Sequence, residues 1–430
     1  MDVLGKISGR SCGHRIGQMV LCDHRFCRVD KRLGVDMART FAGPWVKTHP
    51  WLSFEFLTEA LPSDVWFLLG ESQSKCEHLA GVPLRPDIAA TLHRVYLAKG
   101  VQATTAIEGN TLTEREVLAR IEGNLSLPQS KEYLGREVDN VIAACNTIGR
   151  TAVLGDSQDL SASDLSEYNR MVLQGLPSRP DVVPGVVRDH AIRVGSYIGP
   201  SFEHCASLMA NLCSWLNTSF VATKGQDVPM AILKAIIAHV YFVWIHPFSD
   251  GNGRTARLLE FRLLLEGGVP TPAAHLLSNY YNQTRSEYYR HLDQASMTGG
   301  DLVPFIRYAM SGFVDELREQ VKWIRFQQMD VTWRNYVHER FQDVPASAVR
   351  DRQLHLVLEL STQQAPVSAG DLAGLTPGLA ALYRHKTDKT VTRDVNRLIE
   401  MELVERVGPK VRARQEIVAA FLPARRRPRG

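Results

Sequence analysis

The stretch His246-Pro-Phe-Ser-Asp250-Gly-Asn-Gly253-Arg254-Thr-Ala-Arg257 decides how this chain is interpreted. It begins at the end of a strongly apolar run at residues 229–245, which is predicted to be a helix, and its last four residues begin a second predicted helix at about 254–265. The stretch therefore contains a loop, at residues 247–253, between two core helices. A functional side chain in such a loop is held in a fixed position at the rim of the core.

The residue types in this loop suit the handling of phosphate groups. His246 supplies a base with an ordinary pKa of about 6.5, and Asp250 is a hard oxygen ligand suited to Mg²⁺. Residues 251–253 lead into a helix N-terminus, where free N–H groups attract anions. Arg254 and Arg257 are neighbours on that helix, and a guanidinium binds two phosphate oxygens at once. Together they predict phosphoryl or nucleotidyl transfer, whereas a Gly-rich turn alone is an ordinary helix cap.

The loop resembles the signature of the Fic (Fido-domain) family, HxFx(D/E)GNGRxxR, at every fixed position. Members of that family mostly transfer AMP from ATP to a Ser, Thr or Tyr hydroxyl of a protein. The resemblance implies that His246 is the general base, that Asp250 positions Mg²⁺ and that Phe248 is an apolar anchor. It also implies five phosphate-binding residues: Gly251, Asn252, Gly253, Arg254 for the β-phosphate and Arg257 for the γ-phosphate.

A second motif lies upstream, at the end of a helix predicted over Pro86–Ile107. Thr104-Thr-Ala-Ile-Glu108-Gly109 fits the inhibitory pattern of the same family, (S/T)xxxE(G/N). By resemblance, Glu108 pairs with Arg257, which removes that arginine from the γ-phosphate and leaves ATP in an unproductive pose. The physical basis is sound, because a carboxylate–guanidinium pair is strong and geometrically specific. Taken alone, the hexapeptide is an ordinary helix end.

Two further segments resemble the family less closely. Residues 188–195 resemble its flap, a β-hairpin that covers the site and docks the target by strand addition. This places three residues beside the nucleotide: Ile192, Val194 and Gly195. Tyr288 resembles a residue on the adenine side, where its ring would stack on the base; the alternative is that Tyr288 and Tyr289 pack in the core. Ser296 stands where some relatives have Asn, which leaves the base contacts open.

The signature is more specific for the family than for the reaction. Fic relatives include phosphocholine transferases, a kinase-like member and enzymes that remove AMP. The intact Arg257 favours AMP transfer to a target protein or to the chain itself, autoinhibited by Glu108. The same Glu108 could instead orient a water molecule for AMP removal. A third alternative is a nucleotide-sensing, DNA-binding regulator, and the oligomeric state is left open, with a homodimer as one alternative.

The helical spacing and the resemblance predict a mainly α-helical protein: a Fic-type helical core with a small β-hairpin flap, followed by a winged-helix domain. The predicted parts are a disordered extension (1–36), an N-terminal helical region (37–150), the catalytic core (151–315), a helical connector (316–346) and the winged helix with a basic tail (347–430). In the last part we expect helices at 352–360 and from 367, a recognition helix at 389–401, and wing strands at 403–407 and 415–421.

The net charge of +4 is unevenly distributed over the 430 residues. Residues 1–36 carry +3, residues 37–350 carry −4 and residues 351–430 carry +5. The recognition helix has three basic residues: Lys389, Arg393 and Arg397. With the arginines at 425–429 they predict DNA contact. Three acidic residues on the same helix favour the alternative, a winged helix used only for protein contacts: Asp388, Asp394 and Glu400.

The composition excludes several classes of protein. Hydrophobic residues at 44% and charged residues at 22% are typical of a globular chain, and no run reaches the roughly 20 apolar residues that span a membrane. The seven cysteines form no disulfide scaffold, and we see no signal peptide, so we expect a cytoplasmic location without a membrane partner. Three of these cysteines and two histidines lie within 1–36, where a zinc site, a disordered extension and a true start at Met37 are the alternatives.

Overall fold

The computed structural model describes residues 43–155, 158–177 and 179–419. The predicted extension at 1–36, its zinc alternative and the arginines at 425–429 lie outside these residues. The elements are α1 (Ser63–Gly81), α2 (Pro86–Ile107), α3 (Glu114–Ile121), α4 (Glu132–Leu154), α5 (Ala162–Leu173), β1 (Arg193–Val194), β2 (Tyr197–Ile198), α6 (Phe202–Ser219), α7 (Asp227–Ile245), α8 (Asn252–Glu266), α9 (Thr271–Ala274), α10 (Leu276–Gln283), α11 (Arg285–Met297), α12 (Val303–Arg340), α13 (Ala348–Ser361), β3 (Val367–Ser368), α14 (Pro377–Tyr383), α15 (Asp388–Glu400), β4 (Val404–Val407) and β5 (Lys410–Ala413). The mainly helical class with small antiparallel sheets is as predicted.

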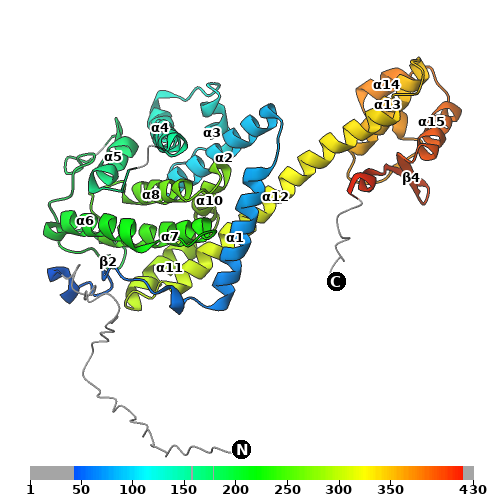
Figure 1. Cartoon of the computed structure of the whole chain (residues 1–430). Helices are drawn as coiled ribbons and strands as arrows, with labels where there is room; N and C mark the ends of the chain where they lie inside the picture. Colours follow the sequence, from blue (N-terminus) through cyan, green and yellow to red (C-terminus); the bar gives the residue numbers. More distant parts are fainter. Residues whose placement is uncertain (1–42, 156–157, 178, 420–430) are drawn as a thin grey trace, which may run out of the picture.

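Helix α7 forms the centre of a helical body, where α6, α8 and α12 pack around it (Figure 1). Its sequence is apolar on every side, which is typical of a helix buried on all faces. Of the described helices, only α7 is long and apolar enough to cross a membrane, yet 83% of its apolar window is buried by the surrounding protein. Its length and hydropathy therefore fit the predicted core helix.

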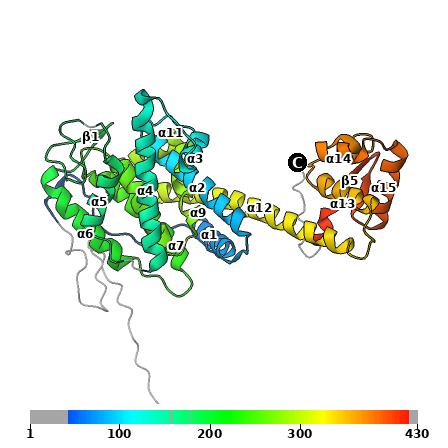
Figure 2. The same cartoon turned by 90° about the horizontal axis from the view of Figure 1, so that it is seen from above.

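The apolar side chains form two separate clusters. One extends from Trp45 to Leu317 in the helical body, and the other from Trp333 to Ala413 in a small C-terminal unit. Helix α12 is continuous over 38 residues and contributes to both clusters, so the border predicted at residue 315 falls inside a helix. Figures 1 and 2 show α12 running from the body out to the C-terminal unit.

The C-terminal unit corrects two details of the sequence prediction. Val367–Ser368 is a short strand, β3, and not the start of a helix, and the second wing strand is Lys410–Ala413 rather than 415–421. The strands pair in the order β3-β5-β4, all antiparallel. The physical reason is the turn at Gly408, whose φ of 61° suits a tight hairpin and brings β5 back directly after β4.

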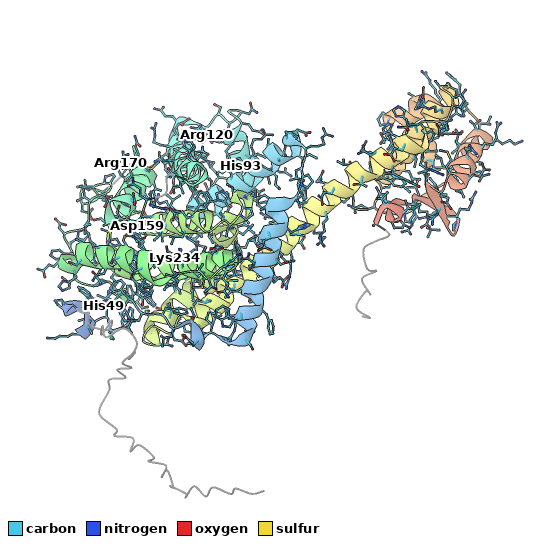
Figure 3. The ribbon with its side chains drawn as sticks, viewed as in Figure 1. His49, His93, Arg120, Asp159, Arg170 and Lys234 are labelled. Carbon is cyan, nitrogen blue, oxygen red and sulfur yellow. The ribbon has the colours of Figure 1, made fainter. Side chains whose placement is uncertain are left out.

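The predicted flap is a short antiparallel hairpin in which Val194 pairs with Tyr197. The N-terminal segment holds this hairpin from outside, because His49 Nε2 lies 2.9 Å from the carbonyl oxygen of Ile198. Figure 3 labels His49 at the edge of the body, in the segment that precedes α1. From inside, Tyr197 Oη donates to the carbonyl of Trp244, two residues before His246. The hairpin is thus fixed close to the loop at 246–257.

Candidate active site

His246 terminates α7 and has the left-handed backbone conformation, with φ of 47°. This conformation is uncommon for a residue with a Cβ, so the surrounding contacts must hold it. Its Nδ1 lies 3.2 Å from the carbonyl of Val243, which assigns the ring proton to Nδ1 and leaves Nε2 as a free acceptor. Burial lowers the pKa of His246 to about 4. The ring is therefore a neutral base at physiological pH.

Arg188 fixes the backbone at His246, a role that the sequence did not indicate. Its Nε donates to the carbonyl of His246 at 2.9 Å, Nη1 to that of His190 at 2.5 Å and Nη2 to that of Pro200 at 2.6 Å. Only 3% of Arg188 is exposed. One guanidinium thus ties both ends of the flap region to the residue at the centre of the motif.

Asn169 and Asn252 shape the loop that follows His246. Asn252 exchanges two hydrogen bonds with the backbone of Phe248, whose ring is buried in the core. Asn169, on α5, donates to the carbonyl of Asp250 at 2.8 Å. Gly251 has a φ of 76°, and a Cβ there would lie 2.8 Å from Asn169 Nδ2. Position 251 therefore requires glycine, because its φ is positive and because a Cβ would have no room beside Asn169.

The N-terminus of α8 is available to an anion. Among the described residues, the backbone N–H groups of Asn252, Gly253 and Arg254 make no hydrogen bond. These groups and the helix dipole favour negative charge. The side chain of Asn252 faces Phe248, so Asn252 offers its backbone to this site. A Cβ at Gly253 would collide with the carboxylate of Glu108, which lies against this helix end.

Arg254 bridges two carboxylates from different parts of the chain. Its Nη1 lies 2.5 Å from Glu137 Oε1, and its Nη2 lies 3.1 Å from Asp250 Oδ1. Glu137 belongs to α4, and its other oxygen accepts from Asn110 Nδ2 at 2.8 Å. Asn110 lies two residues after Glu108, so the segment that carries Glu108 also contacts the partner of Arg254. Neither Glu137 nor Asn110 belongs to a site motif that the sequence indicates.

Arg257 contacts the motif at the end of α2, as the sequence predicts. Its Nη2 lies 2.6 Å from Glu108 Oε1 and donates to the carbonyl of Thr104 at 3.0 Å. Thr104 contributes its backbone oxygen to this contact. Burial alone would raise the pKa of Glu108, but the Arg257 guanidinium outweighs this effect and lowers it. Glu108 is therefore ionised at neutral pH.

A buried polar cluster lies behind Arg257. Tyr281 donates to Glu260 at 2.9 Å, and His239 Nε2 lies 2.9 Å from Tyr288 Oη. Burial raises the pKa of Glu260 to about 8 and lowers that of His239 to about 3, so both are neutral at pH 7. Within the described chain, Glu108 is then the one ionised carboxylate in contact with Arg257. His239 is a packed histidine.

The prediction that Tyr288 stacks on a nucleotide base is wrong. Tyr288 is only 2% exposed, because its ring stacks on Tyr281 and its hydroxyl bonds to His239. Tyr289, one residue later on α11, is 45% exposed and donates to the carbonyl of Ile107. Successive residues on a helix point about 100° apart, so only one of the pair faces the surface. Ser296 is buried and donates to the carbonyl of Asp293.

The flap residues lie at the surface beside the motif. Val194 is 45% exposed and Gly195 has a φ of 58° at the hairpin turn, while Ile192 is half-buried and faces Gly199. At the tip, Ser196 donates to Asp293 on α11 at 2.8 Å. The hairpin therefore spans from the His246 end of the site to α11.

A cavity of about 410 Å³ opens on the motif. Its polar wall consists of Glu137, Asp250 and Arg254. Its apolar wall consists of Tyr133, Leu173, Leu176 and Pro177. Asp250 accepts from the N–H of Gly251 and from Arg254 with Oδ1, and within the described residues Oδ2 has no partner. The combination of a free carboxylate oxygen, a guanidinium and unpaired N–H groups suits a phosphorylated ligand with a divalent cation.

Comparison with known proteins agrees with this geometry. Residues 159–264 match the model of the Fic/DOC family. "Protein adenylyltransferase fic-1" of Caenorhabditis briggsae is 33% identical over 48% of this chain and 38% of its own, and "Protein adenylyltransferase Fic" of Nematostella vectensis is 31% identical over 48% and 44%. The chain thus spans about two fifths of the length of these curated relatives.

Solved structures show the same fold. A Fic family protein from Desulfovibrio desulfuricans superimposes with a TM-score of 0.51 at 24% identity, over 84% of this chain and 97% of its own. Fic-1 from Caenorhabditis elegans gives a TM-score of 0.50 at 25% identity, over 61% and 74%. The matched family segment contains the whole loop at 246–257. Residues 159–264 of this chain are therefore similar to the Fic/DOC family.

Proposed function

We propose that the protein is an adenylyltransferase that transfers AMP from ATP to a Ser, Thr or Tyr hydroxyl of a target protein. The observation that carries the proposal is the neutral His246, whose Nδ1 faces the carbonyl of Val243 and which begins the loop that leads into the unpaired N-terminus of α8, the helix of Arg254 and Arg257. The names of the relatives support the same reaction.

The chemistry requires a base and a stabilised leaving group. The target hydroxyl oxygen attacks the α-phosphorus of ATP, and its proton passes to His246 Nε2. The bond from the α-phosphorus to the oxygen bridging to the β-phosphate breaks, and pyrophosphate leaves. Arg254, Arg257 and the N–H groups of α8 would hold the phosphates and stabilise the charge that develops on the leaving group.

The residues present fit Mg²⁺. Asp250 presents one free carboxylate oxygen beside the cavity, and Mg²⁺ usually takes one or two carboxylates together with phosphate oxygens and water. The described residues contain no group of three or more acidic, His or Cys side chains that would form a closed metal site. Asp250 would therefore hold the ion together with the phosphates, and the ion would neutralise their charge.

Glu108 keeps the resting protein inhibited in this proposal. Arg257 is paired with Glu108, so it is withheld from the γ-phosphate. AMP removal is the alternative reaction, because the Glu108 carboxylate lies against the end of α8 and is 28% exposed, within reach of a water molecule. The two reactions separate in one experiment. Glu108→Gly should increase AMP transfer, whereas it should abolish removal of AMP from a modified target.

The position of a radioactive label in ATP tests the proposed reaction. We would incubate the full chain and Glu108→Gly with Mg²⁺ and ATP labelled at either the α- or the γ-phosphate. Incorporation of the α-label alone supports AMP transfer. Incorporation of the γ-label indicates phosphate transfer, and no incorporation into the chain or into proteins of a lysate argues against both.

Further proposals concern location and partners. We propose a cytoplasmic protein, since the described cysteines are free thiols, as a reducing compartment allows.

We also propose that residues 347–430 form a winged helix with DNA as a second partner, which leaves the nucleotide-sensing regulator as an alternative. Self-modification is tested by labelling the purified chain alone, and a homodimer by light scattering.

A further inference from the structure

Two side chains of α11 cap the C-terminal end of α2. Arg285 Nη1 donates to the carbonyl of Ala106 at 3.2 Å, and its Nη2 donates to the carbonyl of Ile107. Tyr289 Oη shares the Ile107 carbonyl at 3.4 Å, and the centre of its ring lies 5.9 Å from the guanidinium carbon of Arg285. The last carbonyls of a helix have no partner within the helix and carry partial negative charge, so an arginine suits this position.

The capped carbonyl of Ile107 belongs to the peptide unit that leads into Glu108. A peptide unit is planar, so holding its oxygen also holds the backbone from which the next side chain leaves. Glu108 follows the last residue of α2, and the chain turns away at Gly109, where φ is 104°. Helix ends fray unless contacts from outside hold them. The contacts of Arg285 therefore hold the backbone that directs the Glu108 carboxylate toward Arg257.

The two sides of this segment are held by contacts of different kinds. On the α4 side, Asn110 Nδ2 donates to the carbonyl of Leu134 at 3.0 Å and to Glu137 at 2.8 Å, and both contacts are buried. On the α11 side, the side chains of Arg285 and Tyr289 are exposed. Segments held by solvent-exposed hydrogen bonds open at a lower free energy than segments held by buried ones. The α11 side is therefore the more easily opened of the two.

We propose that Arg285 is a positioning residue that acts through Glu108. While Arg285 caps α2, the Glu108 carboxylate stays on Arg257; when the cap detaches, the end of α2 unwinds and Arg257 becomes available to a phosphate. This inference rests on the inhibitory role of Glu108 proposed above. Both terminal nitrogens of Arg285 donate to α2, which leaves neither free for ATP in the resting state. A direct contact with the nucleotide and a purely structural cap are the competing roles.

Calorimetry with ATP and Mg²⁺ tests this role on the full-length unmodified chain, R285Q, Glu108→Gly and the double variant. Gln carries no charge and is too short to reach both carbonyls. R285Q should tighten ATP binding about three- to fivefold, because loss of a hydrogen bond shifts an equilibrium by about that factor. In the Glu108→Gly background, R285Q should change ATP affinity by less than about twofold, since the residue through which it acts is then absent.

R290Q is the matched control. Arg290 is exposed on the same helix and pairs with Glu287, so R290Q removes the same charge and should bind ATP as the unmodified chain does. Hydrogen exchange adds a readout that needs neither ATP nor AMP transfer. The N–H groups of Glu108 and Asn110 both donate to the carbonyl of Thr105 at 3.1 Å, so they report whether the end of α2 is closed.

Exchange at these two amides should be about threefold or more faster in R285Q than in R290Q, while the amides of α7 exchange equally slowly in both, which verifies folding. Equal ATP affinity in R285Q and R290Q would overturn the proposal, and with faster exchange it would show a purely structural cap. Equal exchange in the two variants would overturn it as well.

The two backgrounds separate the remaining outcomes. Weaker ATP binding by R285Q in both backgrounds would show that Arg285 contacts the nucleotide, and tighter binding of the same size in both would show a general effect of charge; each result overturns the proposal. If Glu108→Gly binds ATP no more tightly than the unmodified chain, the inhibitory role of Glu108 fails and this inference fails with it. If Glu108→Gly binds more tightly and R285Q does not, this inference alone fails.

Discussion

Arg257 Nη2 lies 2.6 Å from Glu108 Oε1, while Nε and Nη1 of the same guanidinium are buried without a hydrogen-bond partner among the described residues. The pair joins the end of α2 to the first turns of α8 across 149 residues of sequence. In the resting state, Nη2 is thus the nitrogen of Arg257 that donates hydrogen bonds to described residues. A phosphate group that replaced Glu108 would satisfy more of these donors, so the contact is specific and also exchangeable.

Glu108→Gly should tighten ATP binding, because Arg257 is then free to meet a phosphate. We expect an effect on the order of tenfold, as is usual for coupling between two groups that compete for one site. Calorimetry with ATP and Mg²⁺ measures it. Glu122→Gly is the matched control, since Glu122 is the corresponding residue at the end of α3 and contacts no residue of the motif. Equal ATP affinity in both variants would contradict the inhibitory role of Glu108.

Glu137→Gln should raise the KM for ATP in the Glu108→Gly background. Glu137 is a positioning residue that holds Arg254 at 2.5 Å, and loss of such a supporting carboxylate typically costs about 10- to 100-fold. Asp139→Asn makes the same charge change on the same helix, but Asp139 pairs with Arg120 at the surface and should have no effect. A rise in KM with both variants would point to a general effect of charge on α4.

The acid limb of the pH profile should lie well below the ordinary histidine range. Burial lowers the pKa of His246 to about 4, so kcat/KM for AMP transfer by Glu108→Gly should stay level from pH 8 to about 5 and fall below that. A folded pKa below the unfolded one also means that neutral His246 stabilises the fold above about pH 6.5. That contribution is lost as the pH falls toward 4. If kcat/KM instead fell with a midpoint near pH 6.5, His246 would not be a buried base with a lowered pKa.

The local part of this site could be predicted from the sequence, because the residues of the motif are consecutive. A helix, a short loop and a helix N-terminus fix the relative positions of His246, Asp250 and Arg257 without knowledge of the remaining fold. Contacts such as Glu137 with Arg254, 117 residues apart, depend on how α4 packs on α8. No local pattern specifies that packing, so these partners could not be identified.

The error at Tyr288 has a related cause. The sequence indicates a helix at this place, but not which side of it faces the core. The structure buries Tyr288 and exposes Tyr289, since Tyr288 completes a polar cluster with His239. Three acids on α15 also looked equivalent in the sequence, yet Asp394 alone is turned inward by Arg352. Side-chain direction, rather than helix existence, was the missing information.

Arg188→Ala should destabilise the protein, because it removes the contacts that hold the flap region to His246. It leaves three carbonyl groups without their donor, and we expect a loss of about 3 kcal/mol in the free energy of unfolding. Urea unfolding measures this loss. Arg193→Ala is the control, because Arg193 lies on the exposed side of the same hairpin. Equal stability of the two variants would show that the carbonyl contacts of Arg188 are dispensable.

Tyr288→Phe should lower stability without changing ATP affinity. The substitution removes the hydroxyl that pairs with His239 in the core and leaves a buried ring nitrogen without its partner, which typically costs about 1–3 kcal/mol. Thermal unfolding and ATP titration of the same sample measure the two effects. A large loss of ATP affinity at unchanged stability would show that Tyr288 does contact the nucleotide.

In the proposed reaction His246 is the base for AMP transfer, and Glu108 inhibits that transfer. The most direct measurement compares α-labelled ATP incorporation by four chains: unmodified, Glu108→Gly, His246→Ala and the double variant. We expect weak labelling of the unmodified chain, strong labelling of Glu108→Gly and no labelling of His246→Ala or the double variant. Labelling of the double variant at the level of Glu108→Gly would contradict it.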